Sequence, residues 1–449
     1  MTINQTNPDR SCPALLVSGP ASGQGKTTVT AGLARLYARA GKKVRVFKCG
    51  QDFIDPAWLA LASGAPVHQL DPWLVGEAEC RRRLWQAAGQ SDLLLIEGVM
   101  GLFDGYPSTA DMAITFSLPV LAVIDAWAMA ETFGAISFGL EHYRPEISWR
   151  GVVANRVAGK AHADMLRRSL SDPDHWLGAL PNDRRLCIPE RHLGLTLAST
   201  REESMAILDC AADALALSGF CPLPTVEPVL RSVRFTGPAT AESTPPLLSG
   251  CTVAVARDAA FCFVYDANIV TLQELGATVI FTSPLHDAQL PECDALWLPG
   301  GYPELHAECL SANLSFRESV RRHVACNRPI WAECGGMMCL FESLHTIDSR
   351  SWPMWGVLPG TTRMQDNVAA LGPHTLQLEA GTLRGHTYHH SRCETSLVPQ
   401  RFTKRATGAG EGRGEALFAV DNTRGSYFHA YFSSSMHATA ALFQGMKVT

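Results

Sequence analysis

The sequence predicts an α/β protein in which two parallel-sheet domains follow one another along the chain. Short apolar runs alternate with helical patterns from Ala14 to about Leu217, and a second alternating region starts at Thr252. Such alternation is typical of strand–helix units around a parallel sheet. A chain of 449 residues is also too long for one ordinary core. We therefore expect domains at 12–218 and 251–445, joined by a linker at 219–250.

Each region contains several candidate strands, recognised as short apolar runs bounded by polar or turn residues. The first region has Ala14–Val17, Lys43–Phe47, Leu93–Ile96, Val120–Ile124 and Gly151–Ala154. The second has Thr252–Ala256, Thr278–Phe281, Ala295–Leu298 and Pro329–Ala332, with a helix at Asn268–Leu275. The linker is predicted because proline disfavours both helix and central strand, and this stretch holds Pro222, Pro224, Pro228, Pro238, Pro245 and Pro246. Residues 229–235 within it could still pair locally.

Composition excludes several classes of protein. A net charge of -5 gives no basic surface for nucleic acid, and no apolar stretch reaches the roughly 18 to 20 residues of a membrane helix. The first ten residues are polar and lack the apolar segment of a signal peptide. The 14 cysteines are scattered without a CxxC pair, so we expect reduced thiols and a cytoplasmic protein. A homodimer is compatible with the sequence.

The first candidate site is a glycine-rich loop between a strand and a helix. The strand ending at Ser18 runs into Gly19-Pro20-Ala21-Ser22-Gly23-Gln24-Gly25-Lys26-Thr27-Thr28, and a helical pattern follows at Val29–Ala40. In a P-loop, backbone N–H groups and the helix N-terminus bind phosphate oxygens. The spacing is one residue longer than usual, because five residues separate Gly19 from Gly25. We expect ATP to contact Gly19, Ser22, Gly23, Gln24, Gly25, Lys26, Thr27 and Thr28.

Carboxylates follow two later strands of the same region. Asp52 lies in Gly50-Gln51-Asp52-Phe53-Ile54-Asp55-Pro56, and Glu97 begins Glu97-Gly98-Val99-Met100-Gly101-Leu102-Phe103-Asp104-Gly105. Ligands of parallel sheets bind at the carboxyl ends of the strands, so Glu97 and the Thr27 hydroxyl are expected to hold Mg²⁺. Asp52 and Asp104 are either further ligands, contacts to the acid being activated, or loop residues that cap a nearby helix.

The second candidate site is a cysteine in Ile330-Trp331-Ala332-Glu333-Cys334-Gly335-Gly336-Met337. A cysteine on a sharp strand-to-helix turn resembles a nucleophile elbow, and the helix start would lower its thiol pKa. Upstream, Gly300 and Gly301 end a strand and could supply an oxyanion donor, and His429 in Ser426-Tyr427-Phe428-His429-Ala430-Tyr431-Phe432 could act as base. A cysteine beside glycine is more often a packed thiol, but the ordered set of three segments favours catalysis. His386, His389 and His390 are close in sequence, yet they lack a cysteine or carboxylate at zinc-ligand spacing.

Together these segments resemble the cobyrinic or hydrogenobyrinic acid a,c-diamide synthases of cobalamin biosynthesis. ASGQGKTT, GQDFIDP, EGVMGLFDG, GGYPE, ECGG, GHTYHHS and GSYFHAYF occur in the expected order over nearly the whole chain. The longer P-loop also resembles dethiobiotin synthetase. The resemblance implies a dethiobiotin-synthetase-like P-loop domain followed by a class I glutamine amidotransferase-like domain.

The resemblance also implies the chemistry. ATP would convert substrate carboxylates, the a- and c-acetates of the corrin ring, to acyl phosphates that ammonia displaces. Ammonia would come from glutamine through a thioester on Cys334, with His429 as its base and Gly301 and Gly335 as oxyanion donors. In the ligase half, Asp52, Phe53 and Asp104 match positions implicated in substrate or intermediate binding, and Asp52 and Glu97 match metal-binding positions.

Three positions depart from the family pattern. Tyr431 stands where ordinary class I triads have a glutamate two residues after the histidine, so a Cys-His dyad is implied. Gln51 replaces the usual proline of its motif, with Phe53 as its aromatic residue, and the bulky Trp127 has no explanation. Two alternatives remain: a related tetrapyrrole amidase, such as cobyric acid synthase or a nickel sirohydrochlorin amidase, and a partitioning-type switch ATPase. The last would leave Cys334 without a role.

Overall fold

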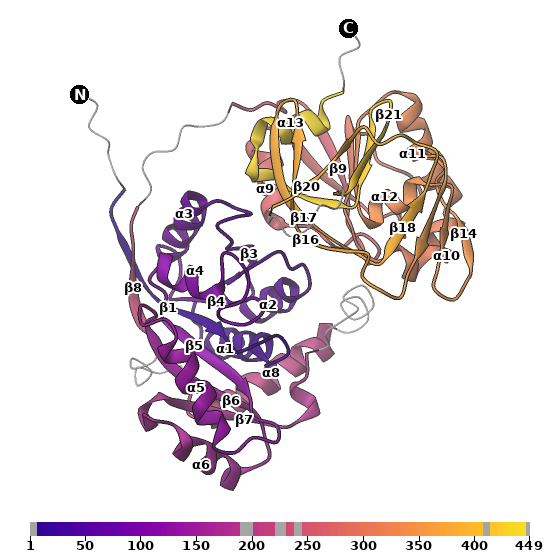
Figure 1. The fold of residues 1–449 in the computed structure, drawn as a ribbon. Helices are drawn as coiled ribbons and strands as arrows, with labels where there is room; N and C mark the ends of the chain where they lie inside the picture. The colour runs from indigo at the N-terminus through magenta and orange to yellow at the C-terminus, as the bar shows by residue number, and fades with distance from the viewer. Residues whose placement is uncertain (1–6, 189–200, 221–229, 238–244, 407–413, 446–449) are drawn as a thin grey trace, which may run out of the picture. The chain divides into compact units, whose positions relative to one another are not determined.

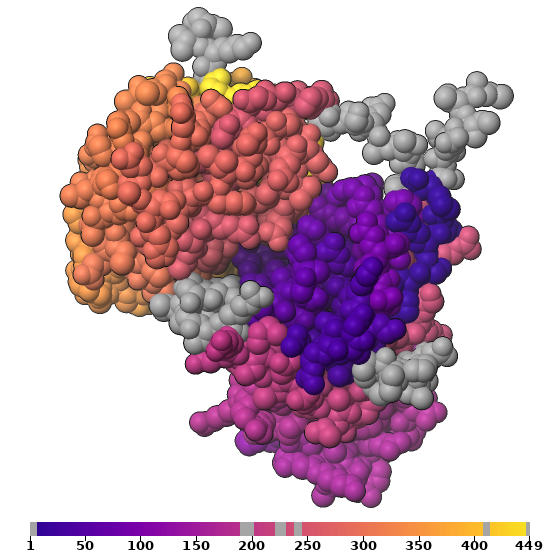
Figure 2. Space-filling view, turned by 180° about the vertical axis from the view of Figure 1, so that it is seen from behind, coloured from indigo at the N-terminus to yellow at the C-terminus, as the bar shows by residue number. Residues whose placement is uncertain are grey.

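The computed structural model describes residues 7–188, 201–220, 230–237, 245–406 and 414–445. They form two compact units, the first containing the described residues up to 237 and the second those from 245 (Figure 1). Pro222, Pro224, Pro228 and Pro238 of the expected linker, and residues 189–200 of the expected first domain, lie outside the described residues. Figure 2 shows the described residues as filled spheres, coloured along the chain as in Figure 1.

The first unit is built on an eight-stranded sheet with the order β3-β2-β4-β1-β5-β6-β7, and β8 also pairs with β1. All of its pairings are parallel except that of β8, which runs antiparallel to β1. Leu15, Leu16 and Val17 of β1 are fully buried, as expected for a parallel sheet covered on both faces. The strands are β1 (Arg10–Ser18), β2 (Val44–Lys48), β3 (His68–Gln69), β4 (Leu93–Glu97), β5 (Val120–Asp125), β6 (Trp149–Val157), β7 (Trp176–Pro181) and β8 (Arg231–Phe235).

Helices connect these strands and begin where the sequence supplies a start signal. Ser108 and Asp111 form a reciprocal capping box at the start of α4, which satisfies backbone N–H groups that the helix cannot. Helix α2 has Pro56 in its first turn and ends at Gly64, whose φ is 70°. The helices are α1 (Lys26–Arg39), α2 (Asp55–Ser63), α3 (Glu77–Ala88), α4 (Thr109–Thr115), α5 (Thr132–His142), α6 (Lys160–Ser169) and α8 (Arg201–Leu217), with 3₁₀ turns η1 (Pro173–His175) and η2 (Arg184–Leu186).

The second unit contains a seven-stranded sheet with the order β10-β9-β11-β12-β22-β21-β19. Its first five strands are parallel, and β21 and β19 add antiparallel pairings at one edge. Alternate residues of β9 enter separate apolar clusters, Ala254 and Ala256 one and Val253 and Val255 the other. This alternation means that the sheet has a core on each face. Its strands are β9 (Thr252–Ala256), β10 (Thr278–Thr282), β11 (Ala295–Leu298), β12 (Ile330–Glu333), β19 (Arg401–Phe402), β21 (Ala416–Val420) and β22 (Thr423–Ser426).

Two four-stranded sheets complete the second unit, with the orders β14-β13-β15-β18 and β20-β16-β17-β23. Their strands are β13 (Ser343–His345), β14 (Ser351–Pro353), β15 (Thr361–Met364), β16 (Ala370–Leu378), β17 (Gly381–His389), β18 (Ser391–Glu394), β20 (Lys404–Arg405) and β23 (Phe428–Tyr431). The helices of this unit are α9 (Asp266–Glu274), α10 (Ala307–Ala312), α11 (Leu314–Ala325), α12 (Gly335–Leu340) and α13 (Met436–Phe443), with η4 (Pro303–His306) and η5 (Phe432–Ser434). No helix among the described residues combines the length and the apolar character needed to cross a membrane.

The predicted strands are confirmed, with differences only at their ends. Helix α1 begins at Lys26, three residues before the predicted start, because Gly25 supplies the left-handed residue that precedes the first turn. Within the predicted linker, the stretch that was expected to be able to pair locally does so: β8 pairs residue by residue with β1, from Phe235 opposite Arg10 to Arg231 opposite Ala14. The sequence did not predict that β8 pairs with β1, because a strand of five residues next to several prolines shows too little apolar periodicity.

The pairing of β8 leads to a stability prediction. Val233 is buried opposite Cys12, so Val233→Asp would place a carboxylate against the apolar edge of the first unit and should destabilise it by about 3 kcal/mol. Ser232→Asp, on the exposed face of the same strand, is the matched control and should change stability by less than about 0.5 kcal/mol. Urea unfolding followed by fluorescence measures both. Equal effects of the two variants would contradict the buried pairing.

Candidate functional site

Six of the eight predicted phosphate-binding residues line a cavity in the first unit, and Gly19 and Gln24 are not in its lining. The cavity has a volume of about 520 Å³ and lies at the carboxyl ends of the parallel strands. Its lining includes Ser22, Gly23, Gly25, Lys26, Thr27 and Thr28 of the P-loop, together with Asp52 and Glu97. The prediction that these segments meet at one sheet edge is therefore confirmed for the lining residues.

The path of the P-loop depends on glycine at defined positions. Gly23 and Gly25 have φ angles of 77° and 96°, in the left-handed region that other residues rarely adopt. A Cβ at Gly25 would also collide with the side-chain amide of Asn155. That amide donates a 2.9 Å hydrogen bond to the carbonyl of Gln24, and the Gln24 side chain accepts one of 2.9 Å from the backbone of Asp125. The ends of β5 and β6 thus hold the loop in shape.

Lys26 is positioned by neutral groups rather than by a counter-ion. Its Nζ donates 2.7 Å hydrogen bonds to the carbonyl oxygens of Ala21 and Met100. Burial, together with the nearby charge of Lys48, lowers the pKa of Lys26 to about 8. An anion in the cavity would stabilise the charged form of this side chain, as a phosphate does in other P-loops.

A buried charge cluster lies beside Thr27. The Lys48 ammonium contacts Glu97 Oε1 at 2.8 Å and Asp55 Oδ2 at 2.6 Å. Although burial alone would favour the neutral amine, these two carboxylates raise the pKa of Lys48. Burial raises the pKa of Glu97 to about 7, against the opposing charge of Lys48. The charges are therefore stable only as a group, because an isolated buried ion is costly.

The same residues suit Mg²⁺ coordination. Thr27 Oγ1 donates a 2.7 Å hydrogen bond to Glu97 Oε1, so the two oxygens predicted to share the metal are already neighbours. Glu97 Oε2 is buried and has no hydrogen-bond donor among the described residues. No group of three or more His, Cys, Asp or Glu side chains is arranged for a metal in the described part of the chain. Mg²⁺ needs no such group, since it usually keeps waters and substrate phosphates as ligands.

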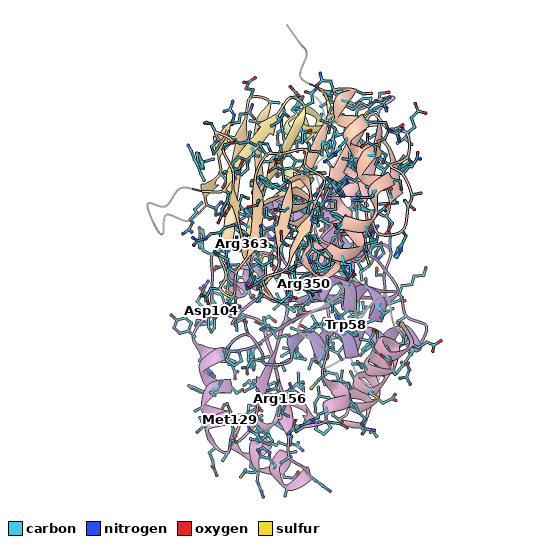
Figure 3. The ribbon with its side chains drawn as sticks, turned by 90° about the vertical axis from the view of Figure 1, so that its right-hand side faces the viewer. Trp58, Asp104, Met129, Arg156, Arg350 and Arg363 are labelled. Atoms are coloured by element: carbon cyan, nitrogen blue, oxygen red, sulfur yellow. The ribbon has the colours of Figure 1, made fainter. Side chains whose placement is uncertain are left out.

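The other predicted residues of this half occupy different places. Asp52 lines the cavity, with Oδ1 accepting a 2.7 Å hydrogen bond from the backbone of Ile54, and burial together with Asp55 raises its pKa to about 6. Phe53 is half-buried and is not in the lining. Asp104 is exposed and accepts a 2.9 Å hydrogen bond from the backbone of Gly101. Figure 3 shows Asp104 apart from Arg156, which lines the cavity.

Trp127 is 60% exposed in the loop after β5, where its backbone N–H donates to Asp125 at 3.0 Å. Nothing in the structure explains its bulk.

In the second unit, Cys334 forms the predicted elbow between β12 and α12. Its φ and ψ are 44° and -110°, a conformation that is strained for a residue with a Cβ. The glycines around it allow close packing: a Cβ at Gly335 would lie 3.1 Å from the backbone nitrogen of Gly301 and 2.7 Å from Pro303. The two predicted oxyanion donors are therefore neighbours at the turn.

His429, on β23, lies beside this elbow. Gly300 lies between the two residues. A Cβ added to it would collide with His429 Cε1 and would lie 3.3 Å from Cys334 Cβ, so Cys334 and His429 both pack against this glycine. The side chains are almost fully buried, with exposed fractions of 5% for Cys334 and 1% for His429. The imidazole also stacks on His386, with ring centroids 4.9 Å apart.

The predicted lowering of the thiol pKa is wrong. Burial raises the pKa of Cys334, and the charge of Glu304 adds to this. The N–H of Gly335 acts in the opposite direction, but one donor at the start of the six-residue α12 does not offset the loss of water around a thiolate. This shift favours the neutral thiol, so Cys334 acting as a nucleophile would need a base to remove its proton.

Sequence reasoning missed two ionisable groups at these sites, Lys48 and Glu333. Each is the last residue of a buried strand, directly before a functional loop. A charged residue that ends an otherwise apolar strand was the available signal.

Of the three histidines considered for zinc, His389 contacts Glu415 at 3.2 Å and His390 lies near the hydroxyl of Tyr388.

Comparisons with known proteins assign both units. Residues 15–195 match the CobQ/CobB/MinD/ParA nucleotide binding domain, and residues 252–437 match the CobB/CobQ-like glutamine amidotransferase domain. The chain is 52% identical over 433 residues to a hydrogenobyrinate a,c-diamide synthase of Stutzerimonas stutzeri, covering 96% of this chain and 99% of that protein. It belongs to the a,c-diamide synthase family.

Two other members of this family match the chain over nearly its whole length. The hydrogenobyrinate a,c-diamide synthase of Pseudomonas aeruginosa is 50% identical, with 96% of this chain and 97% of that protein covered. The cobyrinate a,c-diamide synthase of Herminiimonas arsenicoxydans is 46% identical, with 98% of each chain covered. The protein is thus a glutamine-dependent carbon–nitrogen ligase with a nucleotide-binding domain, and the expected fold class is confirmed.

Two solved structures each resemble one part of this chain. One is a glutamine amidotransferase with 17% identity and a TM-score of 0.28, covering 42% of this chain and 92% of that chain. The other is the septum site-determining protein MinD with Mg-ADP from Pyrococcus horikoshii, with 16% identity and a TM-score of 0.31, covering 46% and 98%. Both scores are low, so the assignment depends on the family matches.

The lack of space for a side chain at Gly300 leads to a prediction for the glutaminase half. Gly300→Ala should displace His429 from Cys334 and reduce glutamine-dependent amidation by about 100-fold, because small displacements of catalytic groups are costly. With ammonium chloride in place of glutamine, the same variant should amidate at the wild-type rate. A parallel loss of both activities would indicate general unfolding rather than displacement of the histidine.

Proposed function

We propose that this protein amidates the a- and c-acetate carboxylates of hydrogenobyrinate or cobyrinate, using ATP and glutamine. The names of the relatives support this substrate class, and the match to them extends over both units. The observation that carries the proposal is the presence of two complementary sites in one chain. One has the residues to bind a nucleoside triphosphate at Lys26 and Thr27, and in the other Cys334 and His429 both lie close to Gly300.

In the ligase half, residues 12–218, the substrate carboxylate attacks the γ-phosphate of ATP and ADP leaves, giving an acyl phosphate. The P-loop from Gly19 to Thr28 holds the phosphates, with Lys26 neutralising the charge that develops. Mg²⁺, held by Thr27 and Glu97 with Asp52 nearby, would screen the phosphate oxygens when bound. Ammonia then attacks the acyl carbon, and phosphate leaves.

Lys48 keeps the carboxylates of this site in place. Its ammonium lies between Glu97 and Asp55 and 3.9 Å from Asp52. It therefore balances the negative charge of the site before the substrate and ATP bind. Asp52 and Asp104 are proposed to contact the substrate or the intermediate, together with Phe53. Of these, Asp52 has support from its position in the cavity.

In the glutaminase half, residues 251–445, Cys334 gives its thiol proton to His429. The sulfur then attacks the side-chain amide carbon of glutamine while Gly301 and Gly335 donate to the oxyanion. The carbon–nitrogen bond breaks, and the proton on His429 goes to the leaving nitrogen, which departs as ammonia. Water hydrolyses the thioester to glutamate and restores the thiol. We place this chemistry in the cytoplasm, where ATP and glutamine are available.

The substrate is tested directly by mass spectrometry. Purified protein is incubated with cobyrinate or hydrogenobyrinate, glutamine and Mg²⁺-ATP, and the products are compared with those from a nickel sirohydrochlorin and from cobyrinate a,c-diamide. Two successive acid-to-amide mass changes on a corrin acid are expected. Amidation of the nickel compound alone, or only of the diamide, would assign the protein to a different tetrapyrrole.

Cys334→Ala should separate the two activities. The variant should lose glutamine-dependent amidation by about 1000-fold or more and keep amidation with ammonium chloride, because acyl phosphate formation does not use the thiol. Cys309→Ala, at an exposed cysteine, is the control and should match the wild type in both assays. Persistent glutamine hydrolysis by Cys334→Ala would refute the thiol assignment.

Lys26→Ala should abolish amidation with either nitrogen donor. Removing the cation that faces the phosphates should lower the rate by about 100-fold or more, measured as ADP release in the presence of the corrin acid. Lys42→Ala, at an exposed lysine after the same helix, should leave the rate unchanged. Glutamine hydrolysis measured without the corrin acid should survive in both variants, and normal amidation by Lys26→Ala would contradict the P-loop assignment.

A further inference from the structure

We propose that Glu333, the residue before the nucleophile, is a positioning residue for His429 and replaces the carboxylate that ordinary class I triads carry two residues after the histidine. Tyr431 stands at that position in this chain. The inference rests on the proposed roles of Cys334 as nucleophile and His429 as base. It adds a group that orients the imidazole and stabilises its charged form during the reaction.

The carboxylate of Glu333 is fixed in place by the fold. The side chain is 1% exposed. Its Oε1 accepts hydrogen bonds from the indole nitrogen of Trp331 at 2.7 Å and from the backbone nitrogen of Ala430 at 3.2 Å. These donors come from β12 and β23, the strands that precede Cys334 and carry His429. The carboxylate therefore joins the two segments that supply the nucleophile and the base.

The second oxygen of Glu333 faces the imidazole. Oε2 lies 3.9 Å from Nδ1 of His429, within the range of an ion pair and longer than a hydrogen bond. Catalytic hydrogen bonds are often long in the free enzyme and shorten when substrate binds. With Nδ1–H turned toward the carboxylate, Nε2 is the nitrogen that accepts the thiol proton, which is the tautomer that the reaction requires.

Other ionisable groups near this pair do not perform the same task. His386 stacks on His429 and accepts or donates through Nδ1 to the Tyr265 hydroxyl at 3.2 Å, and burial lowers its pKa to about 3. His389 on β17 is engaged by Glu415 and by the backbone of Ser391. Burial, followed by the charges of His386 and His389, lowers the pKa of His429. An anion is needed to stabilise the imidazolium here, and Glu333 is the carboxylate that the described residues place against Nδ1.

Burial also makes Glu333 hard to ionise. It raises the pKa of Glu333 to about 8, although Trp331 and Ala430 act in the opposite direction. The step therefore uses the ionised form of Glu333. Proton transfer from Cys334 to His429 then creates a cation beside the carboxylate, and the two opposite charges stabilise each other. No bond to Glu333 forms or breaks in the step. Its role is to hold the Nδ1 proton and to lower the energy of the charged imidazole.

The test compares Glu333→Gln with the wild type in glutamine hydrolysis across the pH range. The amide retains the size of the side chain but cannot carry the charge, so kcat should fall by about 100-fold with KM for glutamine changed by less than about 3-fold. The acidic limb of the kcat/KM profile, which follows the ionisation of Glu333, should be absent, because an amide does not titrate. Amidation with ammonium chloride should be unchanged. Glu342→Gln, at an exposed glutamate, is the matched control.

A second variant moves this limb instead of removing it. Trp331→Phe removes one of the two indole donors to Glu333, leaves that of Trp297, and keeps an aromatic ring. The carboxyl group should therefore ionise at higher pH, and the acidic limb should follow it upward. This variant also serves if Glu333→Gln fails to fold. A wild-type rate and pH profile in Glu333→Gln, or an unmoved limb in Trp331→Phe, overturns the proposal. If Cys334→Ala still hydrolyses glutamine, the proposed function itself fails, which is a separate outcome.

Discussion

The connection between a parallel strand and the helix that follows it positions the candidate site residues in both units. In the first unit, β1 ends at Ser18 and α1 begins at Lys26, with Gly25 in a left-handed conformation directly before it. In the second, β12 ends at Glu333 and α12 begins at Gly335, with Cys334 strained between them. Such turns leave backbone N–H groups pointing away from the sheet. The same geometry can therefore bind phosphate in one unit and stabilise an oxyanion in the other.

The two sites handle buried charge in different ways. The ligase cavity keeps its charges but neutralises them locally, since Lys48 lies between Glu97 and Asp55. The thiol site favours neutral groups, because burial raises the pKa of Cys334 and Glu333 and lowers that of His429. Charge on Cys334 and His429 would then appear only when glutamine binds and the proton moves. A neutral thiol is also oxidised less readily than a thiolate.

Burial explains which residues were difficult to recognise. Lys48 and Glu333 are charged residues at the ends of apolar strands, and a sequence pattern does not show whether such a side chain faces solvent or a site. Asn155 was missed for a related reason, since its role is to bond the backbone of Gln24 from a strand far along the chain. Asp104 illustrates the reverse case: it lies in a specific motif, yet the structure places it on an exposed turn outside the cavity lining.

The sequence by itself determined the order of strands and helices, the P-loop from Gly19 to Thr28, and the candidate nucleophile and base. These follow from local patterns: apolar periodicity, glycine spacing, and the residue types that phosphate binding and thiol chemistry require. Only the tertiary structure decided that β8 joins the first sheet, that Lys48 pairs with Glu97, and that Glu333 faces His429. Each of these depends on contacts between distant segments and on the burial that results, and burial also reversed the expected shift of the Cys334 pKa.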